Sequence, residues 1–295
     1  MRIVSQVREL FRAGWACAVL PHSGFSRINA TIATVQGLLW GLPGLVKLTP
    51  IAFVLVVGVA ASSCRGSVDI ESEVSTLPVA RGVVHAHVRV TGPVPSNEAI
   101  RMNADPMCVK AAGGSHATDE ATRAAADGSL ANVFVELVGN FPDTPAPAEP
   151  VSIEQRGCVY RPRVVGLRAG QPLQVRNSDD GLHNVHGVST DRDAFNVSQP
   201  VSGMLNTFRP RDPGILRLKC DVHTWMVAFV GVVNHPYFAV TGADGAVVLR
   251  DVPEGTYEVR AWHEQLGTIV SQVHVDSARE ATVEMTYSGK AAVTQ

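Results

Sequence analysis

The segment from Gly214 to Val233 constrains the fold of this chain more than any other part of the sequence. It reads GILRLKC, then DVHTWM, then VAFVGVV, so a short loop separates a run of alternating character from an apolar, β-branched run. Runs of this kind predict two strands. Cys220 ends the first, and His223 and Met226 follow with two residues between each pair. A loop this tight can turn a Cys, a His and a Met side chain toward one point.

These residue types suit a particular metal site. A blue copper centre takes one thiolate, two imidazoles and a weak axial thioether. Zinc is the main competitor, but a structural zinc site usually takes more than one cysteine. The second imidazole must come from a neighbouring strand, so that the protein frame fixes the geometry. Segment 172–188, PLQVRNSDDGLHNVHGV, predicts a strand, a turn and then two candidates, His183 and His186. On an extended strand these two point to opposite faces, so only one can face the metal.

The motifs N-S-D…L-H-N and C-D-V-H-T-W-M together resemble the cupredoxin family, and the C-x-x-H-x-x-M loop is similar to that of amicyanin. The resemblance implies a Greek-key β-sandwich that binds one type 1 copper ion. It implies three strong ligands and one axial ligand: His183, Cys220, His223 and Met226. His186 is the fallback for His183. The resemblance also implies that Asn184 hydrogen-bonds across to the Cys-bearing loop and supports the ligands from outside.

The flanking sequence resembles a second family. Residues 241–257 contain the pattern T-x-x-D-G…P-x-G-x-Y of carboxypeptidase-regulatory-like (transthyretin-like) domains, and two earlier segments, VVHAHVRV and LANVFVELVG, resemble the first strands of such a domain. We therefore expect an all-β protein in which a cupredoxin domain, 142–235, is inserted in a smaller sandwich made of 80–141 and 236–288. The alternative is three sequential β units.

Two further cysteines lie outside the ligand loop. In an oxidising compartment, Cys108 and Cys158 could pair and tie the loop after the first strand to the start of the copper domain. Their spacing carries no geometric information, so two free thiols remain the alternative.

The N-terminal region contains an export signal. Residues 51–61 are an uninterrupted apolar run of 11 residues, whereas crossing a bilayer takes about 20. The run suits a signal-peptide core, and the small residues before Cys64 resemble a bacterial lipoprotein signal, with Cys64 lipidated. The alternative is an ordinary cleaved signal peptide. We expect a leader over 1–63, of which 1–45 is a misassigned start, and a tether over 64–79. The mature protein is then periplasmic and lipid-anchored to the membrane.

Function follows from the metal site. The formal net charge of −2 gives no basic field for nucleic acid. Trp262 and His263 adjoin in a predicted strand, but no nucleophile or paired carboxylate accompanies them, so we expect no enzyme activity. A copper ion without an open position carries electrons, cycling between Cu(I) and Cu(II). The expected docking surface is a partly exposed His223 edge beside Trp225, and the cupredoxin resemblance implies a c-type cytochrome or a dehydrogenase as partner. The alternative is a surface β-sandwich that binds carbohydrate or protein and has a vestigial or structural metal site.

Overall fold

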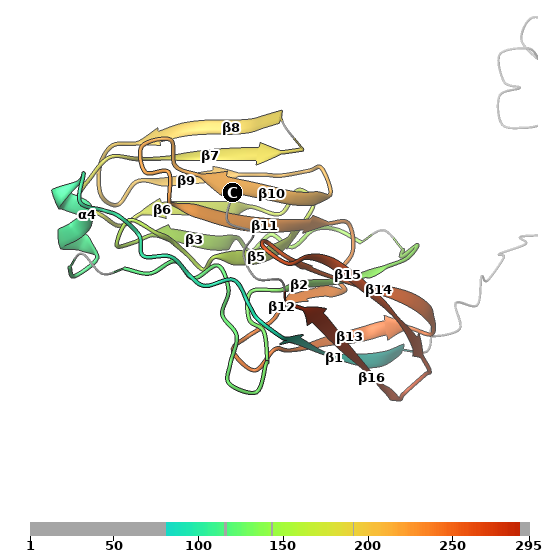
Figure 1. The fold of residues 1–295 in the computed structure, drawn as a ribbon. Helices are drawn as coiled ribbons and strands as arrows, with labels where there is room; N and C mark the ends of the chain where they lie inside the picture. The colour runs from blue at the N-terminus through green and yellow to red at the C-terminus, as the bar shows by residue number, and fades with distance from the viewer. Residues whose placement is uncertain (1–80, 115–116, 143, 191, 290–295) are drawn as a thin grey trace, which may run out of the picture. The chain divides into compact units, whose positions relative to one another are not determined.

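The protein is described by a computed structural model. It covers four ranges, all within one compact unit over 75–295: 81–114, 117–142, 144–190 and 192–289. These residues form sixteen strands, which make four sheets, and one short helix (Figure 1), so the prediction of an all-β protein is confirmed. None of the described helices is long and apolar enough to cross a membrane. The predicted leader, the lipidation site Cys64 and the tether lie outside the described residues and stay predictions.

One sandwich, here called the terminal sandwich, takes strands from both ends of the described chain. Its two sheets have the orders β13-β1-β16 and β12-β2-β14-β15. The strands are β1 (Arg81–Thr91), β2 (Phe134–Val138), β12 (Phe238–Val240), β13 (Ala246–Pro253), β14 (Gly255–His263), β15 (Gly267–Val275) and β16 (Glu280–Ser288). Alternate residues of β1, including Val84 and Val88, enter a core shared with β2 and β14, because side chains on a strand alternate between its two faces.

The other, here called the central sandwich, contains the predicted metal ligands. Its sheets have the orders β5-β11-β10-β7-β8 and β4-β3-β6-β9. The strands are β3 (Val151–Gln155), β4 (Tyr160–Arg161), β5 (Val164–Arg168), β6 (Leu173–Asn177), β7 (His183–Ser189), β8 (Arg192–Gln199), β9 (Leu205–Phe208), β10 (Gly214–Lys219) and β11 (Val227–Val233). Strand β10 pairs antiparallel with both β7 and β11. Antiparallel pairing places the start of β7 beside the end of β10, and this brings His183 to Cys220.

The first part of the segment between β1 and β2 packs on the central sandwich. It contains helix α4 (Pro106–Ala111), whose N-terminus is capped by the Asp105 carboxylate. Ile100, Met102 and Cys108 lie in the core of the central sandwich, although the sequence placed this segment in the other domain. A disulfide joins Cys108 to Cys158, with 5.4 Å between the Cα atoms, and fixes α4 on the turn between β3 and β4.

The two sandwiches also contact each other directly. The guanidinium of Arg163, between β4 and β5, binds both carboxylate oxygens of Glu264 at 2.5 and 2.8 Å, and it also pairs with Asp119. Close by, the rings of Phe229 and Trp262 meet edge to face. Trp262 thus packs between the two sandwiches.

Candidate metal centre

Four predicted ligands are buried in the central sandwich. His183 is the first residue of β7, while Cys220, His223 and Met226 belong to the loop between β10 and β11. None of the four residues is more than 2% exposed. The Nδ1 atoms of His183 and His223 are 3.0 Å apart, and Cys220 Sγ is 3.8 Å from His223 Nδ1. One donor atom from each of His183, Cys220 and His223 lies within 4.8 Å of the others.

These separations fit a single metal ion. Two imidazole nitrogens bound to one ion at about 2.0 Å each lie roughly 3 to 3.5 Å apart, and a thiolate at about 2.3 Å lies slightly farther from them. The donor set of two imidazoles, one thiolate and a nearby thioether is the combination that favours copper over zinc or magnesium. The residues present therefore fit a type 1 copper ion.

Backbone hydrogen bonds close the ligand loop on itself. The N–H of Cys220 donates to the carbonyl of Met226 at 3.2 Å, and the N–H of Met226 donates to the carbonyl of His223 at 2.9 Å. Asn184 accepts a hydrogen bond from the Asp221 N–H at 2.6 Å, so it supports the Cys-bearing loop from the neighbouring strand. The buried Tyr160 hydroxyl donates to the Asn184 carbonyl at 2.9 Å. The loop is therefore held by its own backbone and by β7.

The metal ligands shift one another's pKa values. Burial opposes ionisation of the Cys220 thiol, but hydrogen bonds from His183 and His223 outweigh it and lower its pKa from 9.0 to about 6. Burial also disfavours the charged form of His183, yet Asp179 and Cys220 raise its pKa from 6.5 to about 9. The Cys220 thiolate, and then Asp105, raise the pKa of His223. The metal-free centre is thus an imidazolium–thiolate cluster near neutral pH, and a bound cation must displace protons from it.

A carboxylate contacts the outer nitrogen of each ligand histidine. Asp179 Oδ2 lies 3.0 Å from His183 Nε2, and Asp105 Oδ2 lies 3.0 Å from His223 Nε2. Such a partner fixes which ring nitrogen is free to bind metal, because it holds the proton on the other one. Asp179 also accepts hydrogen bonds from the backbone N–H groups of Gly157 and Cys158. Sequence reasoning missed both carboxylates. Asp179 lies within the predicted turn before His183, whereas nothing local to Asp105 connects it to a histidine 118 residues away.

The expectation of a partly exposed His223 edge is wrong. Its side chain is almost fully buried, because Asp105 and helix α4 cover the outer nitrogen, and Cys108 Sγ lies 3.5 Å from it. The Trp225 ring packs against the His223 ring, with 5.1 Å between centroids, and its Nε1 donates to the Cys158 carbonyl at 3.0 Å. The covering residues come from a distant segment, which the sequence did not place here.

The fallback ligand His186 has other partners. Its Nδ1 lies 2.9 Å from Asp221 Oδ2, and its Nε2 lies 2.7 Å from Asp193 Oδ1. His183 and His186 therefore serve different sites: His183 faces Cys220 and His223, while His186 pairs with two carboxylates at the surface of β7, β8 and the loop.

Several solved structures align with part of the chain. A Cu-containing nitrite reductase from Thermus scotoductus is 18% identical over 34% of this chain, with a TM-score of 0.26, and the match spans only 26% of the reductase. A variant of amicyanin in its Cu(I) form is 16% identical over 28% of this chain and 81% of its own, also with a TM-score of 0.26. A purple cupredoxin from Nitrosopumilus maritimus is 19% identical over 25% of this chain and 81% of its own, with a TM-score of 0.22. No family model and no curated protein matches the chain.

Proposed function

We propose that this protein is a periplasmic blue-copper electron carrier, anchored to the membrane through Cys64. The observation that carries the proposal is the convergence of one thiolate and two imidazole Nδ1 atoms in a fully buried cluster. A bound copper ion supplies one-electron chemistry by alternating between Cu(I) and Cu(II). Residues of the chain hold the donors in place and keep water out. We expect no chemical conversion of a substrate by these residues alone.

The protein frame suits this task because the ligands are held independently of the metal. Asp179 and Asp105 orient the two imidazoles, and the loop from Cys220 to Met226 is closed by backbone hydrogen bonds. A preorganised ligand set changes little between oxidation states, so electron exchange costs little reorganisation.

Exposed apolar side chains gather on loops at the ligand end of the central sandwich. They support the proposal that a protein partner docks there. Four of the seven exposed large hydrophobic residues among the described ranges belong to these loops or the strand beside them: Leu182, Val201, Leu205 and Val222. Asn177 draws two of the loops together, because its side-chain amide donates to the carbonyls of Gly181 and Val201. A surface of this kind would receive the apolar heme edge of a c-type cytochrome or a matching face on a dehydrogenase.

The test is the visible spectrum after Cu(II) is added to the purified protein. We expect an intense thiolate-to-copper charge-transfer band that Cys220→Ser abolishes and His183→Ala removes or shifts. His186→Ala is the matched control and should leave the band in place. A colourless protein that takes zinc equally well would favour the alternative, a β-sandwich binding module with a structural or vestigial metal site.

A further inference from the structure

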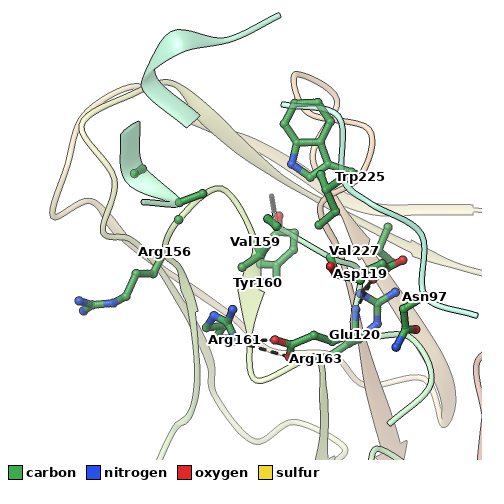
Figure 2. Close-up of a pocket in the computed structure, with 16 residues that line it drawn as sticks. Asn97, Asp119, Glu120, Arg156, Val159, Tyr160, Arg161, Arg163, Trp225 and Val227 are labelled. Carbon is green, nitrogen blue, oxygen red and sulfur yellow. Dashed lines mark hydrogen bonds and ion pairs between the residues drawn. The ribbon is translucent and has the colours of Figure 1, made fainter. Parts of the chain in front are cut away.

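A pocket of about 590 Å³ is lined in part by Trp225 of the ligand loop (Figure 2). Its walls come from the segment between β1 and β2 that contains α4, from the turn and strand that follow β3, and from the ligand loop. The apolar part of the lining includes Ile100, Val159 and Val227, and the Trp225 indole forms a further wall. This volume is within the range of pockets that bind small organic molecules and is far too small for a protein surface.

Of the two aromatic residues of this pocket, Trp225 contacts a metal ligand and Tyr160 contacts residues next to the ligands in the sequence. Trp225 packs on the His223 ring and directly precedes Met226. Tyr160 donates a hydrogen bond to the Asn184 carbonyl, and its hydroxyl lies 3.2 Å from the carbonyl of Lys219, the residue before Cys220. A molecule against the Trp225 ring would therefore be one side chain away from His223.

The short path to the metal through the imidazole edge of His223 is blocked. The outer nitrogen of His223 is occupied by Asp105, and the disulfide at Cys108 holds α4 over it. A partner cannot touch the imidazole edge while this segment stays in place. Trp225 belongs to the same ligand loop, is half-buried and borders the pocket.

We infer that this pocket binds a small aromatic reductant of the phenol or hydroquinone class, which passes electrons through Trp225 to the copper. The inference rests on the proposed function. The apolar residues of the lining suit the faces of one ring, and its polar residues suit the hydroxyls. Those polar groups include the ion pair of Arg161 with Glu120, 3.2 Å apart, which offers both donors and acceptors. Stacking against an indole and pairing of the hydroxyls with these polar residues would together select such a ring.

The reaction balances with copper as the oxidant. One hydroquinone gives two electrons to two Cu(II) proteins in successive encounters. Both of its O–H bonds break, two protons go to water, and one quinone and two Cu(I) proteins result. The chain supplies the binding surface and the path, and no other co-reactant is needed.

Binding is tested first on the metal-free protein, with hydroquinone as the probe. We expect the indole N–H resonance of Trp225, assigned with Trp225→Phe, to shift and saturate as hydroquinone is added. Ala111→Trp fills the pocket from an exposed position on its wall and should weaken this binding at least tenfold. Ala243→Trp, on an exposed turn of the terminal sandwich, is the matched control and should leave it unchanged.

Electron transfer is then followed without oxygen as bleaching of the blue band. We expect the bleaching rate to saturate with hydroquinone concentration in the parent protein and in Ala243→Trp, and to fall at least tenfold in Ala111→Trp. A blue protein that binds no hydroquinone, or that bleaches equally fast with the pocket filled, overturns this inference and leaves the electron-carrier proposal standing. A parent protein with no blue band overturns both, whatever the binding result.

Discussion

Replacing Asp179 by Asn should weaken copper binding without removing any ligand. The carboxylate is 5% exposed and contacts the outer nitrogen of His183 at 3.0 Å, so it holds that ring with Nδ1 toward Cys220. Loss of such an outer partner typically costs 10- to 100-fold in metal affinity, or about 1.4 to 2.7 kcal/mol.

The same substitution should also destabilise the metal-free protein. Asp179 accepts from two backbone N–H groups besides the histidine, at 2.7 and 2.8 Å. An amide has one acceptor oxygen, so at least one buried donor loses its partner, at a cost of about 1 to 3 kcal/mol. For a folded unit of this size we expect the melting temperature to fall by about 2 to 12 °C.

The assay is a competition for Cu(II) between the protein and a chelator, read at the blue band, together with calorimetry of the metal-free protein. Asp193→Asn is the matched control, since Asp193 lies 2.7 Å from the outer nitrogen of His186 but its side chain is 71% exposed. We expect less than about 0.5 kcal/mol from this control in either assay. If Asp193→Asn weakens copper binding and Asp179→Asn does not, His186 is the ligand and the assignment of His183 is refuted.

Three other perturbations test separate parts of the structure. Copper affinity should rise at least tenfold per pH unit between pH 6 and 9 and level off above, because the metal displaces the proton of His183, whose pKa is raised to about 9, and that of His223, whose pKa is also raised, while Cys220 has a pKa of about 6 and is already largely ionised. The check is chelator competition across this range, and a flat profile would contradict the prediction. Met226→Ala should cost the metal-free protein about 2 to 5 kcal/mol in urea unfolding, because the side chain is fully buried, whereas Met226→Leu should cost less than about 1.5 kcal/mol. Arg163→Met should cost about 3 to 5 kcal/mol because it leaves Glu264 buried and unpaired, and adding Glu264→Met should restore part of this; equal stabilities of the single and double variants would argue against the pairing.

The sequence by itself determined the strands and the ligand loop. Alternation of apolar residues in β1 and β10 and the β-branched run of β11 predict strands, because successive side chains of a strand point to opposite faces. The grouping of Cys220, His223 and Met226 was equally predictable, because a loop of this length leaves its side chains little choice of direction. These are local properties, and a few neighbouring residues suffice to specify them.

Only the tertiary structure decided which histidine joins that loop and what covers it. Both His183 and His186 lie on β7, and the pairing of β7 with β10 and β8, with Asp193 and Asp221 placed beside it, directs His186 away from Cys220. The cover of His223 comes from Asp105, more than a hundred residues earlier, and the disulfide there depends on the same packing. Contacts between segments so far apart depend on how whole sheets pack, and no local pattern carries that information.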